Sequence, residues 1–408
     1  MRYVLTFLIV SLVVQTAEAA PMSFDAALTM ASSAPSIAAR GGAVASARAA
    51  AIPALQLPDP KLELGLQDFP VTGPNAGSFT QDDFTMQTVG VVQAFPNLAK
   101  RRAQAGRAAT DIIAAEAAQR VEERSVRIAA GLAWIDLHFA DRRLALLHRL
   151  DASIAAIAAI APSRLVAGSG RPSQALEPRL LAADLADRRA GLVAEIAKAR
   201  AGLARWTGDS APQLVGPVPT WAVDPAALRA ALVRLPILRA AEAATAQADA
   251  DIRLARAGKK PDWEVSAGYG RRDPRFGDLV SIGVAIDLPL FTKRRQNPLI
   301  AARTSDASRV RLEREAAERE QVAALEADLA DHLMHHDRYV RARDVLVPLA
   351  RQRAALDRAS YAGNRGDLGT TLDAQLAAVR AELDAVDREA EVVRDNVRIN
   401  LTYGDDSQ

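Results

Sequence analysis

The chain has 408 residues, no cysteine and nearly balanced charge, with 51 lysine and arginine residues against 49 acidic ones. The lack of cysteine excludes a disulfide framework and a thiolate metal site, and the balanced charge argues against a nucleic-acid-binding protein. Half of the residues are hydrophobic but only 4% are aromatic, which is typical of long helices packed side by side and not of an enzyme core.

The N-terminal segment has the pattern of an export signal. Arg2 precedes a mostly apolar run over residues 4–14, and Ala17 and Ala19 have the small side chains that signal peptidases accept. The run is too short to cross a bilayer, and later apolar stretches are interrupted by charges or consist mostly of alanine. We therefore expect residues 1–20 to be a cleaved signal peptide and the mature protein to be exported without a helical membrane anchor.

The rest of the chain reads as one unit that occurs twice. An alanine-rich helical stretch begins at Pro35 in the first half and at Pro236 in the second. Each is followed by two short alternating segments, a basic triplet, a long helical segment, a glycine-bearing break and a shorter helix. We predict one repeat at residues 21–208 and another at 209–408.

Four segments alternate between apolar and polar residues, the pattern of strands with one apolar face. The predicted strands cover residues 61–69, 84–95, 262–271 and 279–290. Their length suits tilted strands that cross a bilayer, although Gln87 and Gln93 make the second one less regular. Four strands cannot close a barrel, and lipid does not tolerate open sheet edges, so the pattern predicts an oligomer.

The long segments have apolar residues three or four positions apart, which is typical of coiled-coil helices. About sixty residues would span roughly 90–100 Å as a helix. Pro348 interrupts the second segment, where we expect a break or kink. The breaks at about residues 162–173 and 361–369 predict hairpin tips, in which Gly168 and Gly363 would adopt unusual backbone angles.

This order of elements resembles the TolC-like family of outer-membrane efflux proteins over essentially the whole mature chain. Local features that carry the resemblance are Pro-Asp-Pro at 58–60, Pro-Asp-Trp at 261–263, Leu-Pro-Leu-Phe at 288–291 and the stretch 361–375. Pro-Asp-Trp and Leu-Pro-Leu-Phe are most similar to the branch that serves heavy-metal pumps of the cobalt–zinc–cadmium or copper–silver kind. The resemblance implies a mainly α protein with a membrane β-barrel, in which a homotrimer forms a twelve-stranded barrel on an α-helical coiled-coil barrel.

The resemblance also implies a function without catalysis or cofactor: the exit duct of a tripartite RND-type efflux system in the Gram-negative outer membrane, with a long periplasmic extension. Its implied partners are outer-membrane lipid, a periplasmic adaptor and an inner-membrane RND pump, and the implied cargo is heavy-metal cations. A duct for drug efflux or type I protein secretion is an alternative. So is an exported structural coiled-coil or adhesin-like protein, although strand pairs placed between helices count against a stalk.

The same resemblance assigns candidate residues to a periplasmic gate. Asp373 matches a gate aspartate and Arg365 a gate arginine, and Thr370 occupies a position that can carry a second aspartate. Tyr361 lies one residue closer to the arginine than the family pattern has it. Solvated charges beside a turn are the alternative interpretation of Asp373 and Arg365. Candidate adaptor-docking residues at the two tips are Gly168, Gly170, Gly363 and Gly366.

Two histidines are weak metal-ligand candidates. His332 and His336 lie four positions apart on a predicted helix, a spacing that can chelate a metal ion. They also continue the helix's apolar seam, so packing or a polar layer is the simpler interpretation. No glycine-rich phosphate loop and no Gly-x-Ser-x-Gly motif supports an enzyme.

Overall fold

The computed structural model describes residues 21–158 and 176–404, apart from residues 80, 82 and 364. The expected signal peptide and the whole first hairpin tip, with Gly168 and Gly170, lie outside this part. The chain forms two compact units: a hairpin unit (Met1–Ala34, Val126–Pro225 and Ala327–Gln408) and a sheet unit (Pro35–Ser125 and Ala226–Glu326). Each unit takes segments from both sequence halves, and the helices α3 (Leu98–Ala158) and α8 (Gln296–Arg341) contribute to both.

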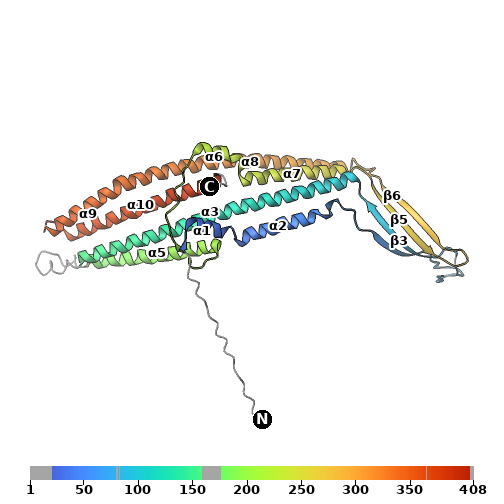
Figure 1. Ribbon diagram of the computed structural model, residues 1–408, viewed down its shortest axis with the longest axis horizontal. Coiled ribbons are helices and arrows are strands. Elements are labelled where there is room, and N and C mark those ends of the chain that lie inside the picture. Colours follow the sequence, from blue (N-terminus) through green and yellow to red (C-terminus); the bar gives the residue numbers. More distant parts are fainter. Residues whose placement is uncertain (1–20, 80, 82, 159–175, 364, 405–408) are drawn as a thin grey trace, which may run out of the picture. The chain divides into compact units, whose positions relative to one another are not determined.

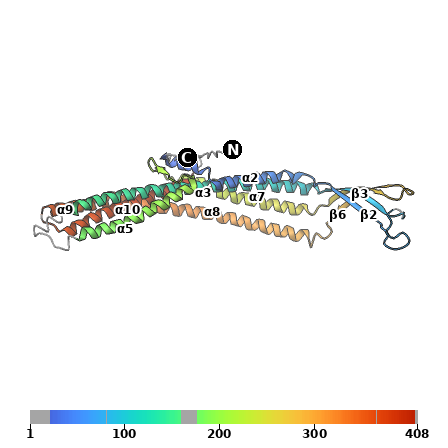
Figure 2. The same ribbon diagram turned by 90° about the horizontal axis from the view of Figure 1, so that it is seen from below.

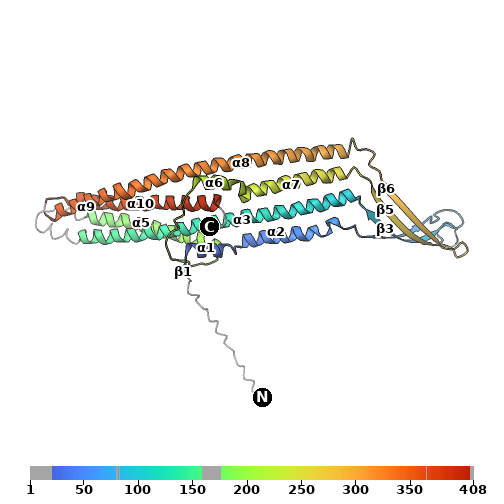
Figure 3. The same cartoon turned by 45° about the horizontal axis from the view of Figure 1, so that its top comes forward.

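The sheet unit contains α2 (Pro35–Ala51), α7 (Pro236–Ala257) and the first parts of α3 and α8, which run side by side in Figure 3. Short elements accompany them: η1 (Pro53–Leu55), α6 (Pro225–Ala231) and η3 (Leu232–Arg234). Proline begins both α2 and α7, because its fixed φ suits the first helical turn, where its missing N–H costs nothing. Ion pairs such as Arg48–Glu116 (2.7 Å) and Arg311–Asp249 (2.5 Å) join neighbouring helices.

The four long strands form one antiparallel sheet in the order β2 (Lys61–Gln67), β3 (Met86–Phe95), β5 (Asp262–Arg271) and β6 (Leu279–Asp287). The central β3–β5 pairing joins the two sequence halves. β2 ends two residues earlier than expected, because Asp68 adopts a left-handed φ of 51°. β6 ends at Asp287, just before Leu288 and Pro289, since a proline cannot donate to the next strand.

Asn97 joins the two halves where the sheet meets the helices. Its side-chain oxygen accepts a hydrogen bond from Lys100 N (2.8 Å), which caps the N-terminus of α3. Its side-chain nitrogen donates to the carbonyls of Ala257 and Lys260 and to Asp262 Oδ1 (2.8 Å). Asp262 also pairs with Lys100 Nζ at 2.7 Å. The start of α3 and the start of β5 are therefore held together by one polar cluster.

The hairpin unit packs α5 (Glu177–Thr207), α9 (Val347–Ala362) and α10 (Leu368–Tyr403) with the later parts of α3 and α8 (Figures 1 and 2). Three small elements that the sequence did not predict complete the unit: α1 (Phe24–Ala31) and the parallel pair β1 (Pro21–Met22) and β4 (Gln213–Leu214). Phe24 packs edge-on against both Trp134 and Trp221, with ring centroids 5.6 Å apart in each case. This aromatic cluster holds α1 on α3.

The helix break expected at Pro348 is present as a π-helical segment, η4 (Ala342–Leu346), between α8 and α9. Pro348 has no N–H with which to continue the α-helical ladder. The preceding N–H, that of Val347, bonds instead to the carbonyl of Ala342, five residues back. No helix among the described residues is both long and apolar enough to cross a membrane.

Candidate functional sites

One face of the sheet is apolar and open to solvent; we call it the apolar face. Register places its residues in one continuous area, because Leu64 pairs with Val89, Val89 with Tyr269, and Tyr269 with Val280. Leu64 is 75% exposed and Ile282 78%. The exposed apolar residues of this face are Leu62, Leu64, Leu66, Val89, Val91, Phe95, Trp263, Val265, Tyr269, Val280, Ile282, Val284 and Ile286. An apolar patch that spans four strands indicates contact with lipid or with another protein.

The opposite face carries mostly small and polar side chains, with Met86, Val92 and Leu279 as the larger apolar ones. A single cross-strand row on this face runs through Glu63, Gly90, Gly268 and Ser281. Gln87 and Gln93 lie on the apolar face, as the less regular second strand predicted, and Gln93 Nε2 donates to the carbonyl of Pro58 at 2.8 Å. The sheet is thus apolar on one side and polar on the other, with β2 and β6 as its two edges.

The second candidate site is the tip of the α9–α10 hairpin. Tyr361 is buried and packs with Leu368 and Leu372, and Leu181 of α5 covers the same cluster. Asp367 caps α10, accepting a hydrogen bond from Thr370 N at 3.4 Å. The burial of Tyr361 gives it a packing role at the tip, whereas the other gate candidates are exposed.

The exposed gate candidates are Arg365, Thr370 and Asp373. Asp373 lies near Glu177, the first residue of α5, which the sequence analysis had not singled out. Burial raises the pKa of the Glu177 carboxyl, and the nearby carboxylates of Asp367 and Asp373 raise it further. An acidic residue in the first turn of a helix is common, so nothing in the sequence marked Glu177. The tip therefore gathers three carboxyl groups from α5 and from the start of α10.

The expectation that Gly363 adopts an unusual backbone angle is wrong, because its φ is −79°. Gly363 ends α9, and its N–H bonds to the carbonyls of Ala359 and Tyr361. Gly366 is the constrained glycine of this turn. A Cβ there would lie 2.9 Å from Tyr361 N and 3.1 Å from Ser360 C, so close backbone approach explains the glycine.

The histidine that joins α8 to α10 is His335, and not His332 or His336, the two metal-ligand candidates of the sequence. His335 Nδ1 lies 2.6 Å from Asp395 Oδ2, and Asp395 also pairs with Arg398. His332 and His336 have ring centroids 6.5 Å apart, and burial lowers the pKa of His332. Among the described residues no group of three or more histidine, aspartate or glutamate side chains is arranged to hold a metal ion.

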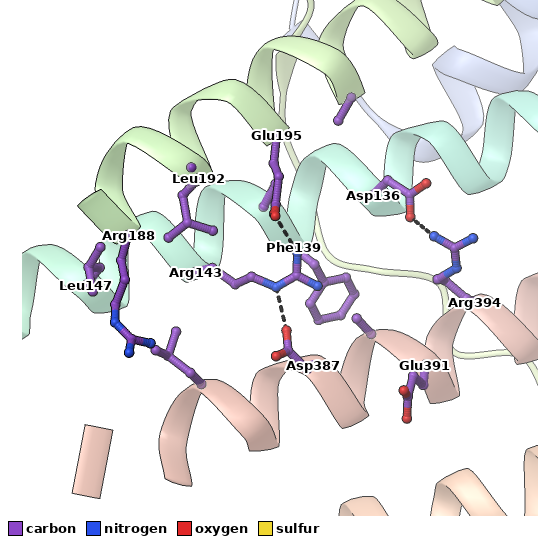
Figure 4. Close-up of a pocket in the computed structure, with 15 residues that line it drawn as sticks. Asp136, Phe139, Arg143, Leu147, Arg188, Leu192, Glu195, Asp387, Glu391 and Arg394 are labelled. Carbon is purple, nitrogen blue, oxygen red and sulfur yellow. Dashed lines mark hydrogen bonds and ion pairs between the residues drawn. The ribbon is translucent and has the colours of Figure 1, made fainter. Parts of the chain in front are cut away.

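A cavity of about 800 Å³ lies between α3, α5 and α10 in the hairpin unit (Figure 4). Arg143 reaches across it to Asp387 (2.5 Å) and Glu195 (3.6 Å). Arg394 pairs with Asp136 at its other end. Because these ion pairs cross the cavity and link the helices, we assign them a structural role.

Comparison with known proteins identifies the fold. No family model and no curated protein matches the chain. Several solved structures each match over 93% of the chain, among them CusC, studied for folding and transmembrane channel formation, with a TM-score of 0.80, 15% identity and 92% of that chain covered. The Campylobacter jejuni CmeC outer membrane channel has a TM-score of 0.79 and 11% identity, with 85% of that chain covered. The open state of the Neisseria gonorrhoeae MtrE outer membrane channel has a TM-score of 0.76 and 17% identity, with 88% of that chain covered. The chain therefore has the fold of these channels.

Proposed function

We propose that this protein is the outer-membrane exit duct of a tripartite RND-type efflux system. It is a passive conduit that carries small solutes across the periplasm and the outer membrane, and it catalyses no reaction. The observation that carries this proposal is the exposed apolar face on a sheet with two edge strands. The fold shared with outer-membrane channels supports it.

The sheet suggests how the duct is built. Its strands alternate in direction, so β6 of one copy can pair antiparallel with β2 of the next without a break in the pattern. Three copies would give a closed twelve-stranded barrel, an even number within the range of bacterial outer-membrane barrels. The apolar face then contacts lipid, and the row through Glu63 and Ser281 faces the lumen.

The hairpin tip is the proposed gate. Arg365 and Asp373 are exposed there, and Asp373 lies near Glu177. Repulsion among the carboxyl groups of Glu177, Asp367 and Asp373 opposes close packing of the tip, so a partner that supplies positive charge would change its stability. The proposed docking region for a periplasmic adaptor is the two tips, including Gly363 and Gly366 and, outside the described residues, Gly168 and Gly170.

Heavy-metal cations are the proposed cargo, on the strength of the Pro-Asp-Trp motif at 261–263 and the Leu-Pro-Leu-Phe motif at 288–291. The cargo is tested by comparing growth of a deletion strain and its parent on graded cobalt, zinc, cadmium, nickel, copper and silver, and on organic drugs and detergents. Sensitivity confined to metals is expected. Sensitivity to organic compounds alone would contradict the metal assignment and favour a drug duct.

Channel formation is tested by adding the purified protein to planar lipid bilayers. A membrane duct gives stepwise increases in conductance, each from one inserted oligomer. An exported coiled-coil or adhesin-like protein, the remaining alternative, gives none. Protein that folds and oligomerises but never produces a conductance step, even after the charges of the hairpin tip are neutralised, would contradict the duct.

A further inference from the structure

The end of the sheet that meets the helices combines exposed apolar side chains with basic ones. β2 and β5 begin at this end and β3 and β6 finish there, since Phe95 pairs with Trp263, and Trp263 with Ile286. Figure 3 shows α2, α3, α7 and α8 all reaching the sheet from this end. The exposed neighbours are Leu98 with Arg102, Trp263 with Lys259 and Lys260, and Phe291 with Lys293, Arg294 and Arg295.

These positive charges are not neutralised within the described part of the chain. Lys100, their neighbour, is the exception, because it pairs with Asp262 at 2.7 Å. The loop end of the sheet has only three arginines: Arg275 pairs with Asp273 at 2.9 Å, Arg272 donates to the carbonyls of Phe276 and Gly277, and Arg271 is exposed. Positive charge available to an external anion is therefore concentrated at the helix end.

Trp263 belongs to the apolar face, and Phe291 follows the end of β6 by four residues. Trp263 is 47% exposed and Phe291 69%. Tryptophan and other aromatic side chains concentrate where a membrane meets water, because the ring is apolar and its edge tolerates the headgroups. Basic side chains beside such a band are placed to meet lipid phosphates.

We infer that Arg102, Lys259, Lys260 and Lys293–Arg295, here called the basic collar, bind the phosphate groups of anionic phospholipids at the membrane surface. The inference rests on the proposed membrane insertion of the sheet and adds a lipid preference and an orientation to it. The collar fixes how deep the sheet sits, with Trp263 and Phe291 at the interface. An acidic protein partner would use the charges but leave the adjoining exposed rings unexplained.

The test measures which lipid borders the inserted protein. Full-length protein is reconstituted into phosphatidylcholine vesicles that contain a trace of spin-labelled phosphatidylglycerol or spin-labelled phosphatidylcholine. Electron paramagnetic resonance then gives the relative association of the two lipids with the protein. We expect about a fivefold preference for phosphatidylglycerol at low salt, falling towards one in 1 M salt, where the Debye length is only about 3 Å.

Matched variants separate the collar from total charge. Lys293→Gln/Arg294→Gln/Arg295→Gln should remove most of the preference. The control Arg309→Gln/Arg311→Gln/Arg319→Gln makes the same change in charge roughly 20–35 Å further along α8 and should keep it. If the first variant fails to fold, Lys259→Gln/Lys260→Gln tests the same collar from the turn between α7 and β5.

The outcomes distinguish the collar from the duct. Protein that inserts but shows equal association with both lipids overturns the collar and leaves the duct intact. A preference lost equally in the collar and control variants also overturns it, because total charge would then be the cause. Protein that inserts into neither kind of vesicle contradicts the membrane-inserted duct itself.

Discussion

Gly363 and Gly366 lie in the same turn at the hairpin tip, yet different constraints act on them. Gly363 has an ordinary φ of −79°, and a Cβ there would come no closer than 3.4 Å to Ala359 O. A Cβ at Gly366 would lie 2.9 Å from the backbone nitrogen of Tyr361. Backbone atoms cannot move aside as the end of a flexible side chain can.

Gly366→Ala should therefore destabilise the tip by about 1–3 kcal/mol, the usual cost of forcing extra volume into a packed site. Gly363→Ala should be neutral or stabilise it by up to about 1 kcal/mol, because it restricts the unfolded chain. Hydrogen-exchange protection of the amides in residues 355–375 measures both. Equal loss of protection in the two variants would contradict the assignment of the close approach to Gly366.

Glu177 gives the tip a pH dependence with a defined sign. Its pKa is raised above its ordinary value of 4.5 by burial and by Asp367 and Asp373, so the folded tip binds the proton more tightly than the unfolded chain. Tip stability therefore falls as the pH rises through 4.5 and the raised value, and stays lower above them. Glu177→Gln should increase amide protection at pH 7.5 and make little difference at pH 4.

A control on the same helix is Asp187→Asn, which removes one negative charge at an exposed position. It should leave protection at the tip unchanged at both pH values. A Glu177→Gln variant that is less protected than the parent at pH 7.5 would show that the ionised carboxylate stabilises the tip.

At this scale the sequence marked some residues and missed others. Asp373 and Arg365 stood out through family resemblance, and the structure places both on the surface of the tip. Glu177 and His335 did not stand out, because their neighbours come from helices distant in sequence: Asp373 in one case, Asp395 in the other. Such pairs arise from tertiary packing, which no local pattern encodes.

At the scale of elements, the two faces of β6 differ in what they tolerate. Val284 lies on the apolar face and pairs with Val265, whereas Ala285 lies on the polar face opposite Glu264. Val284→Lys should block membrane insertion, because a lysine facing the middle of the bilayer costs about 2–4 kcal/mol. Ala285→Lys should insert normally. The fraction of protein retained in the membrane after a urea wash measures both, and equal retention would refute the assignment of the faces.

Asn97 connects three elements of the sheet unit, so its loss should cost as much as that of a strong helix cap. Asn97→Ala removes the cap on Lys100 N and leaves Asp262 with fewer donors. We expect destabilisation of about 1–2 kcal/mol, the upper part of the range for helix caps. The denaturation midpoint of the detergent-solubilised protein measures it. Asn97→Asp should keep the cap but repel Asp262, so a variant as stable as the parent would contradict the role of the amide nitrogen.

Periodicity explains which elements the sequence could predict. Alternation located all four strands of the sheet, and Pro348 located the break that the structure forms as η4. The strands β1 and β4 have two residues each, too few to show a period. α1 has only eight residues, and its position on α3 depends on contacts of Phe24 with Trp134 and Trp221.

At the scale of the whole molecule, the compact units do not follow the two repeats that the sequence predicts. The sheet unit combines strands from both halves, and the hairpin unit combines helices from both. A repeat whose strands must pair with those of the other repeat cannot fold as a separate domain. Neither half expressed alone should yield stable protein, whereas the two halves expressed together should associate and recover it. Co-purification of separately tagged halves measures this, and a stable isolated half would contradict it.

The central claim is that copies of this chain close a barrel by pairing β6 of one with β2 of the next. The chain has no cysteine. Three variants can therefore each carry two introduced cysteines, one at Glu63 and the other at Ser281, Gly283 or Ala285, and a disulfide between them reports only this pairing. For at least one of these variants, oxidation of the membrane-inserted protein should give cross-linked dimers and trimers. No larger species should form, because a closed ring of three copies has no free strand edge for a fourth. A ladder beyond the trimer, or no cross-link with any pair, would contradict the closed trimeric barrel.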